Sequence, residues 1–120
     1  MAKHENYGRY YNRDGDVISL DEFLCLSRDS QYRCVARDYL SGPDETTLFV
    51  STMWLGINHA LMGRPVTFET MVFVQGEGER FTRRYHSEHE ALSGHQWVVN
   101  ELQNGVRVAD LEHVWSGGAS

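Results

Sequence analysis

Two runs of strand-forming residues constrain the fold of this chain more than any other feature. The first run, Leu48 to Ile57, and the second, Pro65 to Val74, are rich in β-branched, aromatic and large aliphatic residues, which favour β-strands. Glycine and asparagine interrupt the stretch between them, as is typical of a connecting turn. We therefore predict a central β-hairpin on which the other elements pack.

The first run is apolar on both of its faces. One face carries Leu48, Val50 and Trp54, and the other carries Phe49, Met53 and Leu55. A strand of this kind is usually central in its sheet and covered on both sides. The second run is more one-sided, with polar residues alternating against its apolar ones. The sequence therefore demands cover for both faces of one sheet.

Capping signals predict two helices. A capping box at Ser19–Glu22 precedes a short amphipathic segment, and it predicts a helix over about residues 20–28. A second box at Ser87–Glu90 begins a longer segment, and Gly105 stands where a helix C-terminal glycine belongs. The apolar stripe between them predicts the longest helix, with Ala91, Leu92, His95, Val98, Val99 and Leu102 on one face.

Shorter signals complete the expected fold. Asp14-Gly15 predicts a tight hairpin turn, residues 31–40 and 80–85 alternate like strands, and residues 106–114 form a weaker strand candidate. We predict a single α+β domain over residues 1–120, with loose ends at about 1–9 and 115–120. Its mainly antiparallel sheet has four to five strands, a long C-terminal helix packed on it and a short N-terminal helix.

Composition narrows the class of protein. The formal net charge of −6 argues against sequence-independent nucleic-acid binding. No apolar run approaches the roughly 20 residues of a membrane span. Cys25 and Cys34 are the only cysteines, and two cysteines outside a C-x-x-C pair indicate reduced thiols rather than a zinc site. We expect a cytoplasmic protein without cofactor, metal, membrane or nucleic-acid partner.

The segment from Asn12 to Glu22 resembles a calcium-binding loop in its acidic spacing. With Asn12 in the first position, Asp14 and Asp16 take the third and fifth, as in an EF-hand. The turn glycine is missing, however, and Glu22 falls one position early. We interpret the segment as a hairpin turn followed by a helix cap.

Histidines supply the only candidate for catalysis. His95 interrupts the apolar stripe of the long helix, where a core histidine with one hydrogen bond is the simpler interpretation. The alternative is a small hydrolase-like or metal-assisted enzyme in which His95 pairs with Glu69 or with His59. His86 and His89 lie on a different helical face from His95, so the three do not converge on a metal. No known catalytic motif supports the enzyme interpretation.

Protein–protein interaction is the leading functional hypothesis. Trp97 lies opposite the apolar stripe among charged residues, a composition typical of an interface anchor unless the sheet or the C-terminal tail covers it. A second apolar surface arises because the short helix is too small to cover the other sheet face. We expect that face to form an interface, including a homodimer, through Phe49, Met53, Leu55, Met71 and Phe73.

Three blocks carry a resemblance to a known group. They are Tyr10 to Phe23, Val50 to His59 and Phe68 to Phe73, and in this order they resemble small uncharacterised proteins of actinobacteria and their bacteriophages. The resemblance spans about residues 10–103 and implies a phage accessory role inside the infected cell, with no assigned activity and no catalytic residue. A minor virion component is the further alternative.

Overall fold

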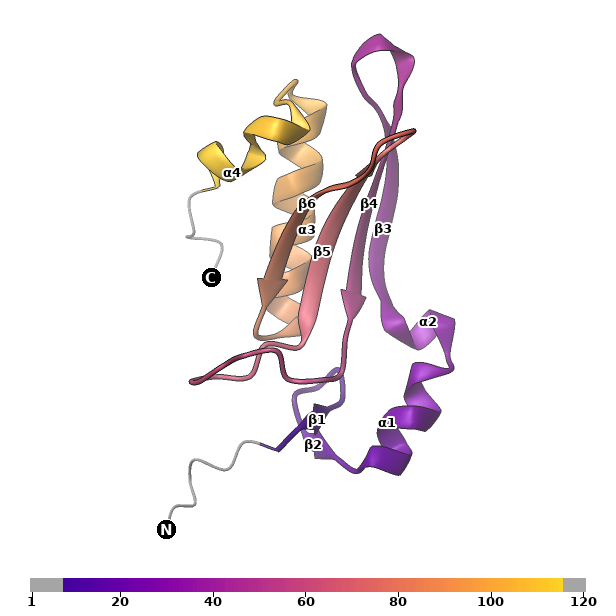
Figure 1. Ribbon diagram of the computed structural model, residues 1–120, viewed down its shortest axis with the longest axis vertical. Coiled ribbons are helices and arrows are strands. Elements are labelled where there is room, and N and C mark those ends of the chain that lie inside the picture. Colours follow the sequence, from indigo (N-terminus) through magenta and orange to yellow (C-terminus); the bar gives the residue numbers. More distant parts are fainter. Residues whose placement is uncertain (1–7, 116–120) are drawn as a thin grey trace.

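The computed structural model describes residues 8–115 and has an α+β fold (Figure 1). Its main sheet is antiparallel, with the strand order β3-β4-β5-β6. The strands are β3 (Cys34–Ser41), β4 (Thr47–Trp54), β5 (Phe68–Val74) and β6 (Gly78–Tyr85). The long helix α3 (Glu88–Gln103) packs across one face of this sheet. The predicted fold class and the predicted central hairpin, β4–β5, are confirmed.

A smaller unit lies at one end of the sheet (Figure 1). It contains β1 (Tyr10–Tyr11), β2 (Val17–Ile18), α1 (Leu20–Ser27) and α2 (Ser30–Arg33). The Oδ1 atom of Asn12 accepts a hydrogen bond from the backbone N of Asp16 at 2.9 Å. The hydroxyl of Ser19 caps α1 through the backbone N of Glu22 at 3.1 Å. The calcium-like segment is therefore a hairpin turn followed by a helix cap.

Side-chain caps also explain where α2 and α3 begin. The Oδ1 atom of Asp29 accepts hydrogen bonds from two backbone N–H groups of α2, and this turn occupies the first residues of the predicted 31–40 strand. The hydroxyl of Ser87 accepts from the backbone N of Glu90 at 3.1 Å. Gly105 has a φ of +94°, the left-handed conformation that glycine adopts most readily after a helix.

The prediction of a strand over residues 106–114 is wrong. The segment forms a 3₁₀ turn, Val108–Asp110, followed by the short helix α4 (Leu111–Val114). Val108 and Leu111 are three residues apart, so a helical turn places both against the same core, where Leu111 is fully buried. A strand would point them to opposite sides. Another 3₁₀ turn, Pro43–Glu45, joins β3 to β4.

The inner parts of both expected loose ends are held in place. The carbonyl of Arg9 accepts a hydrogen bond from the backbone N of Asn58 at 3.0 Å. The ring of Trp115 lies 4.8 Å from the ring of Trp97. The rest of both predicted loose ends, 1–7 and 116–120, lies outside the described residues. No helix within residues 8–115 is both long enough and apolar enough to cross a membrane.

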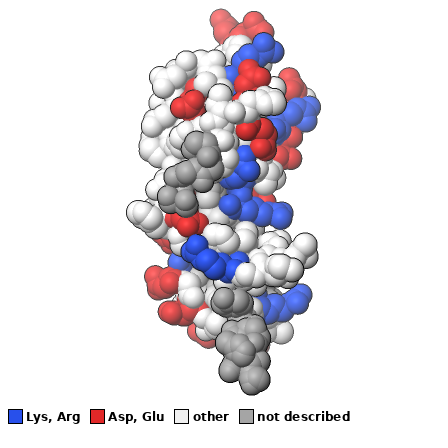
Figure 2. Space-filling model, turned by 90° about the vertical axis from the view of Figure 1, so that its left-hand side faces the viewer, with Lys and Arg blue, Asp and Glu red and all other residues white. Residues whose placement is uncertain are grey.

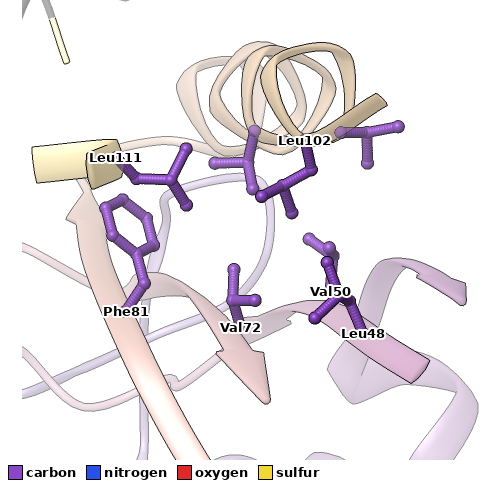
Figure 3. Packing of buried hydrophobic residues seen from close by; sticks show 8 residues of the cluster. Leu48, Val50, Val72, Phe81, Leu102 and Leu111 are labelled. Carbon is purple, nitrogen blue, oxygen red and sulfur yellow. The ribbon is translucent and has the colours of Figure 1, made fainter. Parts of the chain in front are cut away.

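Two apolar clusters fill the space between the sheet and α3. The larger lies under the C-terminal half of α3, as Figure 3 shows, and contains Leu48, Val50, Val72, Phe81, Val98, Val99, Leu102 and Leu111. The smaller lies nearer the N-terminal unit and contains Trp54, Phe68, Tyr85 and Ala91. Three buried polar residues fall between the two clusters in sequence: Thr52 on β4, Thr70 on β5 and His95 on α3. The core therefore has a polar layer across its middle.

Candidate functional site

The face of the main sheet that turns away from α3 carries a row of aromatic rings. The register pairs Tyr39 with Phe49 and Phe49 with Phe73, on three neighbouring strands. The Tyr39 and Phe49 rings are stacked with centroids 4.6 Å apart, and those of Phe49 and Phe73 are 5.9 Å apart. We call this side of the sheet the open face. Stacking holds the three rings as one apolar strip.

Residues beside the aromatic row extend the open face. Met71 pairs with Ser51 in the next cross-strand row, and Met53 pairs with Glu69 in the row after it. Phe49, Met53, Met71 and Phe73 are all half-buried, and Tyr39 is 69% exposed. A hollow of about 300 Å³ adjoins the ring strip and is lined by Thr47, Phe49, Phe73, Val74 and Gln75. The face is therefore apolar at its centre and hollowed at one end.

Within residues 8–115 no helix covers the open face. In Figure 1, α3 lies behind the sheet and no helix crosses in front of the strands. The apolar clusters that hold the helices contain neither the aromatic row nor the two methionines of the open face. Among these residues, the helices cover only one of the two faces of the first run, although cover on both faces is expected.

Charged side chains border the open face, and their charges balance. The register places Arg37 on this face at the β3 edge, and Glu79 and Arg84 on it along β6. Arg84 donates a hydrogen bond from Nε to Oε2 of Glu69 at 2.9 Å. The hydroxyl of Thr82 donates to Oε2 of Glu79 at 2.5 Å. This hydrogen bond holds the carboxylate near the cross-strand row that contains Ser51, Met71 and Thr82. Two arginines and two glutamates give this face a formal charge of zero.

The polar layer of the core is a continuous chain of hydrogen bonds. The Nε2 atom of His95 lies 2.8 Å from Oδ2 of Asp38, and its Nδ1 atom lies 2.7 Å from the hydroxyl of Thr52. The hydroxyls of Thr52 and Thr70 are hydrogen-bonded to each other. The hydroxyl of Tyr85 donates to that of Thr70 at 3.1 Å. This series of hydrogen bonds thus runs from Asp38 at the surface to the buried phenol of Tyr85.

One direction of donation satisfies every link in this chain. In this direction Nε2 of His95 donates to the carboxylate of Asp38, and Nδ1 accepts from the hydroxyl of Thr52. Each threonine hydroxyl then donates once and accepts once, and Tyr85 supplies the first proton. Burial raises the pKa of the Tyr85 phenol, which keeps it a donor. The layer is therefore fully hydrogen-bonded.

The Thr52–His95–Asp38 arrangement has the order of a catalytic triad but not its exposure. In a triad the nucleophilic hydroxyl reaches the substrate and the carboxylate is buried. Here the Thr52 hydroxyl is fully buried beneath α3, while the Asp38 side chain is 49% exposed. The hydroxyl also receives the hydrogen bond of Thr70, so no substrate atom approaches it. This geometry supports a structural role for these hydrogen-bonded side chains.

The residues of the enzyme hypothesis do not meet. His95 is buried on the α3 side with Asp38 and Thr52, whereas Glu69 lies on the open face with Arg84. The alternative pairing of His95 with Glu69 is wrong because neighbouring positions on β5 point to opposite faces. His59 is exposed in the β4–β5 connection, where its backbone N donates to the carbonyl of Val66. The core interpretation of His95 agrees with its burial.

Trp97 is not the free anchor that its place among charged residues suggests. Its ring packs edge-on against Trp115 at 4.8 Å, so the C-terminal segment lies over it. The guanidinium of Arg83 lies 4.7 Å from the ring centre of Trp115 and also pairs with Glu112. The side chain of Trp97 is half-buried by this packing. The open face is therefore the better candidate for an interface.

The remaining ionisable contacts are structural in their geometry. Arg13 donates two hydrogen bonds to the Glu88 carboxylate at 2.7 and 2.6 Å, joining the N-terminal hairpin to the start of α3. This pairing lowers the pKa of Glu88 and raises that of Arg13. His86 bonds through Nδ1 to the carbonyl of Pro65. Among the described residues, no three histidine, cysteine or acidic side chains come together as metal ligands.

Sequence reasoning misses Arg37, Asp38 and Tyr39. Arg37 and Tyr39 stand on the face of residues 31–40 that the alternation predicts to be polar, and Asp38 shares the other face with Cys34, Ala36 and Leu40. The alternation is correct, but β3 is an edge strand whose two faces differ. Asp38 faces α3 and reaches His95, while Arg37 and Tyr39 border the open face. The available signal is Thr52 and Thr70, which stand in the middle of two apolar strands and opposite His95.

Comparison of this chain with protein-family models, with curated proteins and with solved structures finds no match.

Proposed function

We propose that this chain is a small accessory protein of an actinobacterial bacteriophage or its host, acting in the cytoplasm by binding protein through its open face. The observation that carries the proposal is the aromatic strip of Tyr39, Phe49 and Phe73, which no helix within residues 8–115 covers. An apolar surface of this kind on a folded chain is typical of an interaction site. Aromatic residues are also the side chains that most often anchor protein interfaces.

The ring geometry favours a protein partner over a nucleic acid. Proteins that bind single strands present ring faces on which bases stack, beside a positive groove. Here the faces of Tyr39, Phe49 and Phe73 are turned toward one another, at interplanar angles of 18° and 24°. The charges around them sum to zero, and Figure 2 shows basic and acidic side chains interspersed on the neighbouring side. Neither stacking nor phosphate attraction is supported.

The test is a paired substitution on the open face. Phe49→Thr with Phe73→Thr removes two anchors and keeps side chains that suit a strand. Leu24→Gln, which removes a 43%-exposed leucine from α1, is the matched control. Capture from infected actinobacterial cells, read by mass spectrometry, should recover protein with the wild-type and control baits and lose it with the paired variant. Equal recovery by all three folded baits would refute the proposal.

The virion alternative is separated by location. A minor structural component is found in purified particles at constant stoichiometry, whereas an accessory protein stays in the soluble fraction of infected cells. Immunoblotting of gradient-purified particles distinguishes the two. The enzyme alternative has no comparable support, because His95 is buried on the α3 side whereas Glu69 lies on the open face with Arg84.

A further inference from the structure

The geometry points to a second copy of this chain as the occupant of the open face, in a twofold dimer whose axis runs parallel to the strands. This inference rests on the proposed function, since it names the partner of the same surface. It is carried by the charge pattern of the face, by the size of the face and by the hollow beside its aromatic strip.

The charge pattern explains why a second copy of the chain can bind at the open face. The chain carries a formal net charge of −6, so two copies repel each other over most of their surfaces. The open face is different, because the charges of Arg37 and Arg84 balance those of Glu69 and Glu79. Two copies that meet through this face bring no excess of like charge into the contact.

The arrangement of these charges selects the axis. A twofold axis parallel to the strands and between β4 and β5 places β3 of one copy opposite β6 of the other. Arg37 then faces Thr82 of the second copy, whose hydroxyl holds the Glu79 carboxylate in the same row. The symmetry forms this Arg37–Glu79 contact twice. An axis perpendicular to the strands that runs along the aromatic row places β3 against β3, and it brings Glu79 against Glu79 of the second copy.

The same axis also matches the apolar groups. It places Phe49 of one copy opposite Phe73 of the other, and Ser51 opposite Met71. The hollow of about 300 Å³ beside Phe49 and Phe73 gives the opposing ring a space to enter. Sheets that pack face to face with nearly aligned strands lie about 10 Å apart, with interdigitated side chains. A dimer of this kind resembles a β-sandwich with α3 on each outer side.

The size of the face fits a weak but specific dimer. Four strands of about seven residues cover about 19 Å by about 23 Å at the usual spacings of a sheet. Two such faces hide roughly 900 Å² of flat surface, and side-chain relief raises this toward the about 1,200 Å² at which specific interfaces begin. We therefore expect a dimer that dissociates on dilution.

Charge reversal tests the axis as well as the partner. Arg37→Glu and Glu79→Arg each place like charges together twice in their own homodimers. Each variant should weaken dimerisation by about tenfold or more. An equimolar mixture of the two variants should recover the dimer, because one contact then joins the two substituted side chains, of opposite charge, and the other keeps the native Arg37–Glu79 pair. Arg28→Glu, which lies away from this face and changes the net charge as Arg37→Glu does, should leave the dimer intact.

Sedimentation velocity over a dilution series gives the readout, and circular dichroism confirms that each variant is folded. A wild-type chain that stays monomeric at its highest soluble concentration overturns the inference. A dimer that neither reversal weakens, or one that mixing does not recover, also overturns it. If a monomeric wild type still captures a protein that the Phe49→Thr, Phe73→Thr variant loses, the proposed function stands with a foreign partner. If the wild type is monomeric and those substitutions leave the captured protein unchanged, both the dimer inference and the proposed function are refuted.

Discussion

Replacing the Thr52 hydroxyl should be the most costly single change in the polar layer. Thr52→Val keeps the shape of the side chain and removes only the oxygen that joins two neighbours. Without it, the Thr70 hydroxyl loses its acceptor and Nδ1 of His95 loses its donor. Thr52 and Thr70 are fully buried and His95 is 4% exposed, so water does not replace the lost bonds.

The size of the effect follows from counting these stranded groups. A buried polar group left unpaired costs about 1–3 kcal/mol. Thr52→Val leaves two such groups unpaired, so the free energy of unfolding should fall by about 2–6 kcal/mol. Tyr85→Phe leaves no donor unpaired. The Tyr85 hydroxyl only donates to Thr70, and Thr70 keeps its hydrogen bond to Thr52. Its cost should be about 1 kcal/mol.

Asp38→Asn offers the control at the surface end. An asparagine oxygen still accepts from Nε2 of His95, and the Asp38 side chain is half-exposed. The expected loss is below about 1 kcal/mol, since one charge-assisted bond becomes a neutral one with access to water. The three variants therefore test whether the loss in free energy of unfolding is largest in the middle of the hydrogen-bond network and smaller at its two ends.

Urea unfolding followed by circular dichroism measures the gradient, with the dependence on denaturant compared among variants. NMR of the His95 ring nitrogens tests the direction of the chain independently, and we expect the Nε2–H tautomer. If Thr52→Val costs no more than Tyr85→Phe, the two orphaned groups find other partners and the reasoning about the layer is refuted. An Nδ1–H tautomer would refute the direction of donation.

Three further predictions use other parts of the chain. The pKa of Glu88 is lowered by Arg13, so this pair stabilises the fold above about pH 4.5 and loses its effect as the pH falls; acid unfolding of Glu88→Gln should begin from a lower stability and be less steep, and parallel curves would contradict this. Burial raises the pKa of Tyr85, so the folded state keeps its proton longer than the unfolded state and stability should fall above about pH 10; alkaline unfolding of Tyr85→Phe should be flatter, which urea titrations at several pH values measure. Calcium should leave the melting temperature unchanged, because the Asn12–Glu22 segment is a turn and a cap; a rise of several degrees that Asp14→Ala abolishes would refute this.

Local signals in the sequence are sufficient for most of the fold. The Ser19 and Ser87 caps act within three residues, and the alternation of the central strands follows from the period of a strand. The segment from Val106 to Val114 is not predictable in this way. Its few apolar residues fit a strand or a turn of helix, and packing of Leu111 against the core decides between them. Tertiary contact overrides such weak local preference.

The candidate site is only partly predictable for a related reason. Two-sided apolarity in the first run predicts that both sheet faces need cover, and α3 covers one of them. It does not show which side α3 takes, and the choice of Glu69 as a partner for His95 depends on that. Once α3 takes the face of Thr52 and Thr70, Glu69 is placed with Arg84 and the aromatic strip. The location of polar residues among apolar strands carries this information.

The buried layer and the open face are coupled through strand register. The pairing of Thr52 with Thr70 on the inner face fixes that of Phe49 with Phe73 on the outer face. A slip of two residues keeps the alternation of faces but leaves the two hydroxyls apart, which costs about 1–3 kcal/mol for each unpaired group. The polar layer therefore selects the one register in which the aromatic strip is continuous.

Replacing the whole layer should separate stability from this selection. A variant with Val at 52 and 70, Leu at 95 and Phe at 85 leaves no buried hydroxyl of the layer unpaired, so its stability should exceed that of Thr52→Val alone. Its β4–β5 register keeps the backbone hydrogen bonds but loses the side-chain hydrogen bond between positions 52 and 70. We expect faster amide exchange along β5 and weaker self-association, although every open-face residue is unchanged. Exchange and association like those of the wild type would show that the apolar clusters alone hold the register.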